Sequence, residues 1–419
     1  MLILLLLLPQ PLLAARMLDL DGALAIAMER NRDIAGAREY ARYVEGKYVE
    51  ERAAALPQLS LNASSSMARD NGQPAFAGGG TNQYDNYVGV ALAQPLFTWG
   101  KIGAAIRAAE IGRQTAAEQL RLARQAVRRN VVACFCEVLL ARDLAALARE
   151  TLSQKQRHQA EVQKKFAAGV ATDYDLLAAN VALENARPGV IKSDNSLKLA
   201  RERLRFLLAL DEEVDAVGSL EVVPAGIPEL AEVLREALVN RPELRDLALR
   251  IGIYGELVTI AAADDKPRLD LKAGAGWHQL EMMKERNDGT SWQAGVYLTF
   301  PFFDGLRTAG RVEQARSDLA SREIERQKLL DSIRLEARNA RHELEEAGEI
   351  VAALAATVSQ AERLLQMAEK GYEFGVKTRL EVDDAQTNLV QARTNRSRAL
   401  ADYRKAGVNL DWVMGRLGE

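Results

Sequence analysis

Cysteine and histidine are rare in this chain of 419 residues, which contains two cysteines and three histidines. Metal sites built from thiolates and imidazoles need more of these ligands at close spacing, so we expect no metal site. Aromatic residues are also few, at 5%, although 48% of the chain is hydrophobic. The apolar content excludes wholesale disorder, while the thin aromatic share argues against a compact enzyme of this length.

An excess of basic charge is missing as well, because 55 basic side chains stand against 58 acidic ones, for a formal net charge of −3. Nucleic-acid binding calls for a basic patch or a strongly basic domain, so we expect no nucleic-acid partner. The sequence also contains no Gly-rich phosphate loop and no plausible catalytic triad. We therefore expect no enzyme activity and no cofactor, and the energy for any transport must come from a partner.

A long apolar run occurs only at the start of the chain. Residues 1–15, MLILLLLLPQPLLAA, are typical of a secretory signal peptide that is cleaved near Ala15. A membrane-spanning helix needs about 18 apolar residues in a row, and no such run follows residue 15. The sequence therefore predicts an exported protein that can cross a membrane only with strands.

Proline, a helix breaker, is absent from residues 96–187 and from every position after 301. We predict one very long helix in each stretch, at about 101–168 and about 305–371, each roughly 100 Å long at 1.5 Å per residue. A tight turn and a second long helix should follow each of them. Pro188 removes a backbone hydrogen bond and is expected to kink or end the helix that contains it.

The long helices carry the pattern of coiled coils. From Ile333 to Tyr372, apolar residues recur at alternating steps of three and four, which is a 3.5-residue period. A similar seam runs through Val131, Cys134 and Val138. Many seam positions are alanine, so neighbouring helices can approach closely.

The two halves of the chain repeat each other, and a constant offset over several segments rarely arises by chance. The offset is 210 for the first segment, from residue 57 to 267, and 206 for the others, as from 89 to 295. Each half reads as strand, strand, long helix, tight turn, long helix. The matching segments are 57–63 with 267–273, 89–97 with 295–303, and 169–187 with 375–393.

The proline-bracketed regions alternate apolar and polar residues with period two, as strands do. Leu269 and Leu271 fall on one face, while Asp270 and Lys272 fall on the other. Segments of about ten residues with this pattern suit the wall of a transmembrane β-barrel. An ordinary antiparallel sheet packed on a core fits the strand pattern equally well.

The number of strands limits the possible architectures. Four strands cannot close a barrel, because about eight is the smallest number that does. Lipid leaves no place for open sheet edges, so strands that span a membrane must be pooled by several chains. Three copies would supply twelve strands, which is wide enough for a lumen.

Four segments, at residues 94–101, 166–173, 299–307 and 371–385, carry a resemblance to a known family. They read QPLFTWGK, FAAGVATD, TFPFFDGLR and GYEFGVKTRLEVDDA. With their order, their duplication and the long helices between them, the chain resembles the TolC-like outer-membrane efflux and secretion channels of Gram-negative bacteria. The resemblance covers essentially the whole chain after the signal peptide.

The resemblance implies a mainly α fold with β, in which long antiparallel helical hairpins form an α-barrel in a homotrimer. Twelve shared strands would form one barrel in the lipid of the outer membrane, and the helices would extend into the periplasm. A periplasmic adaptor (membrane fusion protein) and an inner-membrane pump of the RND, ABC or MFS type would dock at the far end. The expected organisation is a signal peptide (1–15), N-terminal helices (16–56), a first β-hairpin (57–100), a first helical hairpin (101–210), an equatorial linker with short helices (211–266), a second β-hairpin (267–304), and a second helical hairpin with the C-terminal end (305–419).

The turns of the two helical hairpins are candidate functional sites. A Gly that ends one helix and a Thr that starts the next are ordinary caps, which is a purely structural role. The resemblance implies a second role, because adaptor hairpins contact the tunnel at these tips. The tip residues are Gly169, Val170, Ala171, Thr172, Gly375, Val376, Lys377 and Thr378.

Glu381 and Asp384 lie three residues apart and should share one helix face. The resemblance implies that acidic residues here project into a closed periplasmic entrance as rings of like charge, which favour cations. For Glu381 a local explanation is equally available, because it stands three residues after Thr378 and can complete a capping box.

Tyr372, Lys377 and Asp173 match positions where the family holds its entrance shut through contacts between neighbouring hairpins. The family usually has Arg where this chain has Lys377, and Lys cannot form the planar two-point pairing with a carboxylate. Merely solvated side chains on a turn are the alternative.

The sequence thus favours a passive exit duct of a tripartite efflux or type I secretion system. The alternative is a periplasmic structural coiled-coil or adaptor protein without a membrane barrel, which would share the helices and the signal peptide. The exported substrate, whether drug, metal ion or protein, stays open at this point.

Overall fold

The computed structural model describes residues 16–70, 81–282 and 285–418, so the predicted signal peptide lies outside the described residues. The strands are β1 (Arg16–Leu18), β2 (Gln58–Asp70), β3 (Thr81–Phe97), β4 (Val214–Ala216), β5 (Arg268–Met282) and β6 (Glu285–Thr299). The helices are α1 (Leu20–Arg30), α2 (Arg32–Ala53), α3 (Lys101–Ala167), α4 (Asp173–Leu208), α5 (Leu230–Asn240), α6 (Pro242–Ala262), α7 (Arg307–Glu373), α8 (Arg379–Val413) and the short 3-10 helix η2 (Arg416–Gly418).

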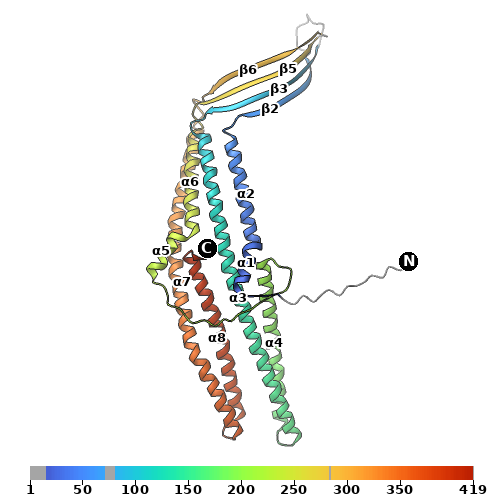
Figure 1. The fold of residues 1–419 in the computed structure, drawn as a ribbon, viewed down its shortest axis with the longest axis vertical. Helices are drawn as coiled ribbons and strands as arrows, with labels where there is room; N and C mark the ends of the chain where they lie inside the picture. Colours follow the sequence, from blue (N-terminus) through green and yellow to red (C-terminus); the bar gives the residue numbers. More distant parts are fainter. Residues whose placement is uncertain (1–15, 71–80, 283–284, 419) are drawn as a thin grey trace, which may run out of the picture. The chain divides into compact units, whose positions relative to one another are not determined.

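The chain divides into two compact units. The first contains residues up to 38, 119–242 and 329 onward, and the second contains residues 39–118 and 243–328. Figure 1 shows the elements of both units, coloured along the sequence.

The long helices have nearly the predicted extents. Both α3 and α7 comprise 67 residues, which corresponds to roughly 100 Å. The seam residues are buried as expected, among them Val131, Val138 and Ile333, each 0% exposed. Pro188 was expected to kink or end its helix, and α4 continues through it to Leu208, so it does not end the helix. After the proline, α4 packs into the core through buried Leu204 and Leu208.

The main core of the first unit joins both helical hairpins. It takes residues from α1, α3, α4, α7 and α8, including Leu204 and Val138. The short strands β1 and β4 pair in parallel beside it, through Met17 and Asp215 among others. In Figure 1 the turn between α3 and α4 and the turn between α7 and α8 lie at the same end of this unit.

The second unit contains an antiparallel sheet in the order β2-β3-β5-β6. The register places Leu61 opposite Val90 and Leu271 opposite Val296, so the apolar residues of all four strands share one face. The predicted alternation of faces is therefore confirmed. Below the sheet, Asp264 at the end of α6 accepts from Lys101 of α3 at 2.5 Å and from Arg311 of α7 at 2.8 Å.

The apolar face of this sheet is uncovered. Leu61 is 74% exposed and Trp292 is 81% exposed, and no described residue packs a core against them. Neither β2 nor β6 has a further partner among the described strands, so both edges are open. Every helix within the described residues is too short or too polar to cross a membrane.

Candidate functional site at the helical turns

The two hairpin turns end their first helices in the same way. Gly169 has φ 71° and Gly375 has φ 72°, the left-handed region that glycine enters without steric cost. The N–H of Val170 donates to the carbonyl oxygen of Lys165 at 2.8 Å, and the N–H of Val376 donates to that of Gly371 at 2.8 Å. These bonds close two Schellman motifs, so the duplicated glycines serve the same backbone geometry.

The two turns also start their second helices alike. The N–H of Thr378 donates to Glu381 Oε2 at 2.7 Å, and the N–H of Glu381 donates to Thr378 Oγ1 at 3.4 Å. The predicted capping box is therefore present. Thr172 and Asp175 form its counterpart, which the sequence analysis missed although the Thr-x-x-Asp spacing was readable.

The tips expose apolar side chains. Val170 is 77% exposed and Val376 is 78% exposed, and Phe374 and Leu380 beside them are also exposed. Of the eight predicted tip residues, only Ala171 is half-buried. An exposed apolar cluster of this kind is typical of a surface that contacts a partner protein.

The two acidic residues of the predicted rings differ in their surroundings. Glu381 accepts from Lys377 Nζ at 2.5 Å and from the Thr378 backbone, and these bonds lower its pKa to about 2. Asp384 is exposed and has no ion pair or side-chain hydrogen bond within the described part of the chain. Asp384 is therefore unrestrained by these neighbours, whereas Glu381 is held by its own turn.

No hydrogen bond, ion pair or cation–π contact joins the predicted latch residues to one another in the described part of the chain. Tyr372 lies in the last turn of α7, with Lys165 Nζ 5.7 Å from its ring centre. Lys377 of the turn binds Glu381 in the first turn of α8. Asp173 is the first residue of α4, exposed and without an ion pair among the residues that the structure describes.

An ion pair that the sequence analysis missed links the two hairpins instead. Lys155 of α3 donates to Asp383 of α8 at 3.0 Å, and Arg379 also donates to Asp383, at 3.3 Å. Burial raises the pKa of Asp383, but the Lys155 hydrogen bond and the two nearby cations outweigh it, and the net pKa is lowered. The two partners are 228 residues apart in sequence, so no local pattern joins them.

Comparison with known proteins identifies the family. The family described as Outer membrane efflux protein matches residues 23–210 and 233–416, which include both halves of the duplication. The chain belongs to the outer membrane efflux protein family. Membership shows an outer-membrane protein and confirms the resemblance stated from the sequence.

Individual relatives of this efflux protein share moderate identity. Protein CyaE of Bordetella pertussis is 28% identical over 68% of this chain and 59% of its own length, so the chain spans less than two thirds of that relative. The cobalt-zinc-cadmium resistance protein CzcC of Cupriavidus metallidurans is 27% identical over 96% of this chain and 91% of its own length. The CmeC outer membrane channel of Campylobacter jejuni has the same fold, with a TM-score of 0.84 at 19% identity over 96% of this chain and 86% of that one.

A polar cavity of about 780 Å³ lies near the tips of this efflux protein, between α3, α7 and α8. Three buried polar atoms along it have no hydrogen-bond partner among the residues that the structure describes: Gln154 Oε1, His158 Nδ1 and Arg379 Nε. Burial and the charge of Arg379 lower the pKa of His158. The region where α3 meets α7 and α8 near the tips is therefore polar and contains unfilled space.

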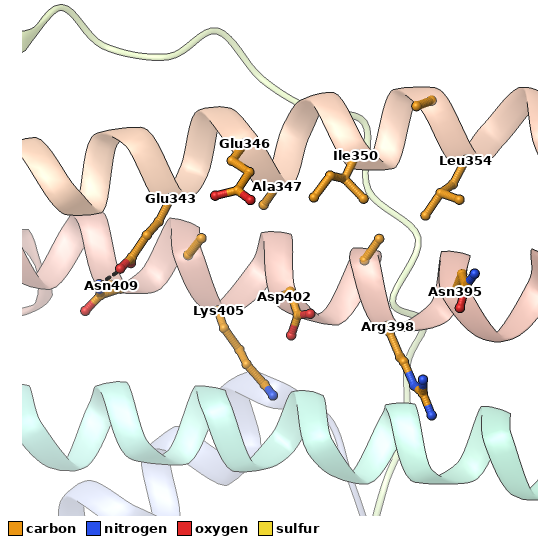
Figure 2. A pocket seen from close by; sticks show the side chains of 13 residues that line it. Glu343, Glu346, Ala347, Ile350, Leu354, Asn395, Arg398, Asp402, Lys405 and Asn409 are labelled. Carbon is orange, nitrogen blue, oxygen red and sulfur yellow. Dashed lines mark hydrogen bonds between the residues drawn. The ribbon is translucent and has the colours of Figure 1, made fainter.

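A second groove, of about 810 Å³, runs between α7 and α8 in the main core region (Figure 2). Ile350 and Leu354 form its apolar floor. Acidic Glu346 and basic Lys405 are among its lining residues, and Asn409 donates to Glu343 at 3.3 Å. Charges of both signs give it no preference for an ionic ligand.

Proposed function

We propose that this outer membrane efflux protein is the passive exit duct of a tripartite efflux or type I secretion system. Three copies would close their sheets into one twelve-stranded barrel. The observation that carries the proposal is the sheet with two open edges and one uncovered apolar face. Unpaired sheet edges cannot remain in lipid, and a large apolar face cannot remain in water. A ring of copies pairs the edges and places the apolar faces against lipid.

The polar face of the same sheet suits a water-filled lumen. Ser60, Asn62 and Ser64 alternate with the apolar residues of β2. Across β3 and β5, His278 Nε2 lies 2.9 Å from Asp85 Oδ1, so these two polar side chains of this face are paired. A lining that is polar but nearly balanced in charge would let diverse cargo pass without binding it tightly.

The hairpin tips are the proposed contact with a periplasmic adaptor, which would connect the duct to an inner-membrane pump. Their exposed Val170 and Val376 support this proposal, because identical backbone turns present identical apolar side chains. In a trimer, two turns from each of three chains would place six turns around one entrance. An adaptor with repeated apolar hairpins would fit such a surface.

The acidic residues would form the gate of the entrance. Three copies of Asp384 would make a ring of like charge that attracts cations. Glu381 would contribute a second ring of negative charge while capping its own helix. Contacts of Tyr372, Lys377 and Asp173 between neighbouring copies stay a proposal for the closed state.

The cargo is proposed to be selected by the pump. Relatives of similar identity have names as different as cobalt-zinc-cadmium resistance protein and fusaric acid resistance protein. A common duct serving different pumps accounts for that diversity, since the tips and the sheet are features of the fold. Resistance profiles of a deletion strain would identify the cargo directly.

A matched pair of substitutions on β2 tests the membrane role. Leu61→Arg places a charge on the apolar face, and Asn62→Arg places it on the polar face of the next residue. If the apolar face meets lipid, Leu61→Arg destabilises the protein by about 2–4 kcal/mol and depletes it from the outer membrane, while Asn62→Arg does not. Both side chains are exposed in the single chain, so a soluble coiled-coil spacer would tolerate both. Equal tolerance would therefore overturn the duct in favour of the spacer.

A further inference from the structure

Apolar packing between the two hairpins is concentrated away from their tips. The main core takes α3 residues up to Ala145 and α8 residues from Ala399 onward. Nearer the tips, two smaller clusters continue the packing, around Ala361 and around Ala368. Both draw their residues from α7 and α8 alone, so they hold the second hairpin together without fastening it to the first.

The contacts that join the hairpins in this region are charged. Lys155 of α3 meets Asp383 of α8 at 3.0 Å, and Glu150 of α3 meets Arg393 of α8 at 3.4 Å. The first pair is the better shielded one, because its side chains are 19% and 33% exposed. Screening by water weakens exposed pairs most, so Lys155 and Asp383 carry the stronger link.

A second cation also lies at the Asp383 carboxylate. Arg379 approaches the same carboxylate from the preceding turn of α8, and its own Nε is buried without a partner. Moving α8 away from α3 would separate Lys155, whose side chain is 19% exposed, from the Asp383 carboxylate. Removing one partner while the helices stay packed would leave the other as a half-buried unpaired charge, which is costly, so the pair stabilises the packing of α8 against α3.

We infer that Lys155 and Asp383 form a hairpin bridge that holds α8 against α3 near the tips, and that this bridge must break before the second hairpin moves away from the first. The inference rests on the proposed function, in which the hairpin tips surround the entrance of the duct. Within one chain, the hairpins are then held together by Lys155 and Asp383 and not by the predicted latch residues Tyr372, Lys377 and Asp173. Lys377 is already bound to Glu381, and Asp173 has no ion pair in the described part of the chain.

The test compares Lys155→Met, Asp383→Asn and the double variant in the purified full-length protein. Spin labels at Gln156 of α3 and Asn388 of α8, both exposed, report the distance between the hairpins. The native cysteines do not interfere, because burial raises the pKa of both thiols, that of Cys134 to about 12. Single-channel recording in planar bilayers reports the open fraction of the same samples.

Each single variant should increase the separated population by about fivefold, and the double variant should add little more, because both singles remove the same interaction. Asp194→Asn is the matched control, since Asp194 pairs with Arg149 within the first hairpin at 2.6 Å. This control should leave the distance between α3 and α8 unchanged.

Unchanged distances in both single variants, or additive effects in the double variant, would overturn the hairpin bridge. An equal response of the Asp194→Asn control would overturn it too, because any lost ion pair would then suffice. If the distances change as expected but every sample, including the wild type, passes no current, the bridge stands and the duct is refuted. If all samples conduct and neither distance nor open fraction responds, the duct stands and the bridge is refuted.

Discussion

Gly375→Ala measures how strongly the turn between α7 and α8 depends on its left-handed backbone. A Cβ at this position would meet nothing within 4 Å, so the substitution causes no clash. The cost is conformational, because φ 72° is unfavourable for an L-residue by about 1–2 kcal/mol. Reduced freedom of the unfolded chain returns about 0.4–1 kcal/mol, which leaves a net loss of roughly 1 kcal/mol.

Amide hydrogen exchange at Val376 is the assay, because its N–H donates to Gly371 across the turn. A loss of roughly 1 kcal/mol should speed exchange there about fivefold. Gly310→Ala is the control, since Gly310 is exposed inside α7 and a Cβ there also meets nothing within 4 Å. It should stabilise its helix by about 0.5–1 kcal/mol. Equal behaviour of the two variants, or slower exchange in Gly375→Ala, would refute the argument from backbone conformation.

Two further predictions concern charge and burial. Replacing Glu381 and Asp384 by Ala together should abolish block of single-channel current by multivalent cations, and unchanged block would exclude both as ring residues. Burial raises the pKa of Cys134 to about 12 and also raises that of Cys136, so at pH 8 both remain protonated thiols. Thiol reagents should therefore leave both unlabelled at pH 8 until the protein unfolds, and prompt labelling of the folded protein would contradict the buried seam.

Patterns with a short period were sufficient to predict much of the fold. The proline-free stretches predicted the extents of α3 and α7. The 3.5-residue repeat predicted which of their residues are buried, since seam residues face a neighbouring helix. The period-two alternation placed Leu61 and Leu271 on one face of the sheet. The capping box at Thr378 was equally readable, because its two residues are three apart and its hydrogen bonds are local.

Contacts between distant segments were out of reach. Asp383 and Asp384 are adjacent, and only the packing of α8 against α3 decides that Asp383 is half-buried against Lys155 while Asp384 is exposed. For Pro188 the sequence allowed either a kink or a helix end, and only the structure shows that α4 continues through it. The three-residue strands β1 and β4 are too short to leave a periodic pattern.

The number of chains in the particle extracted from the outer membrane tests the central claim most directly. The mass of the intact particle is measured in detergent, and the same sample is then added to a planar bilayer. A closed ring of sheets predicts three chains per particle and a stepwise ionic current for each inserted particle. A single-chain particle that inserts without passing current would contradict it.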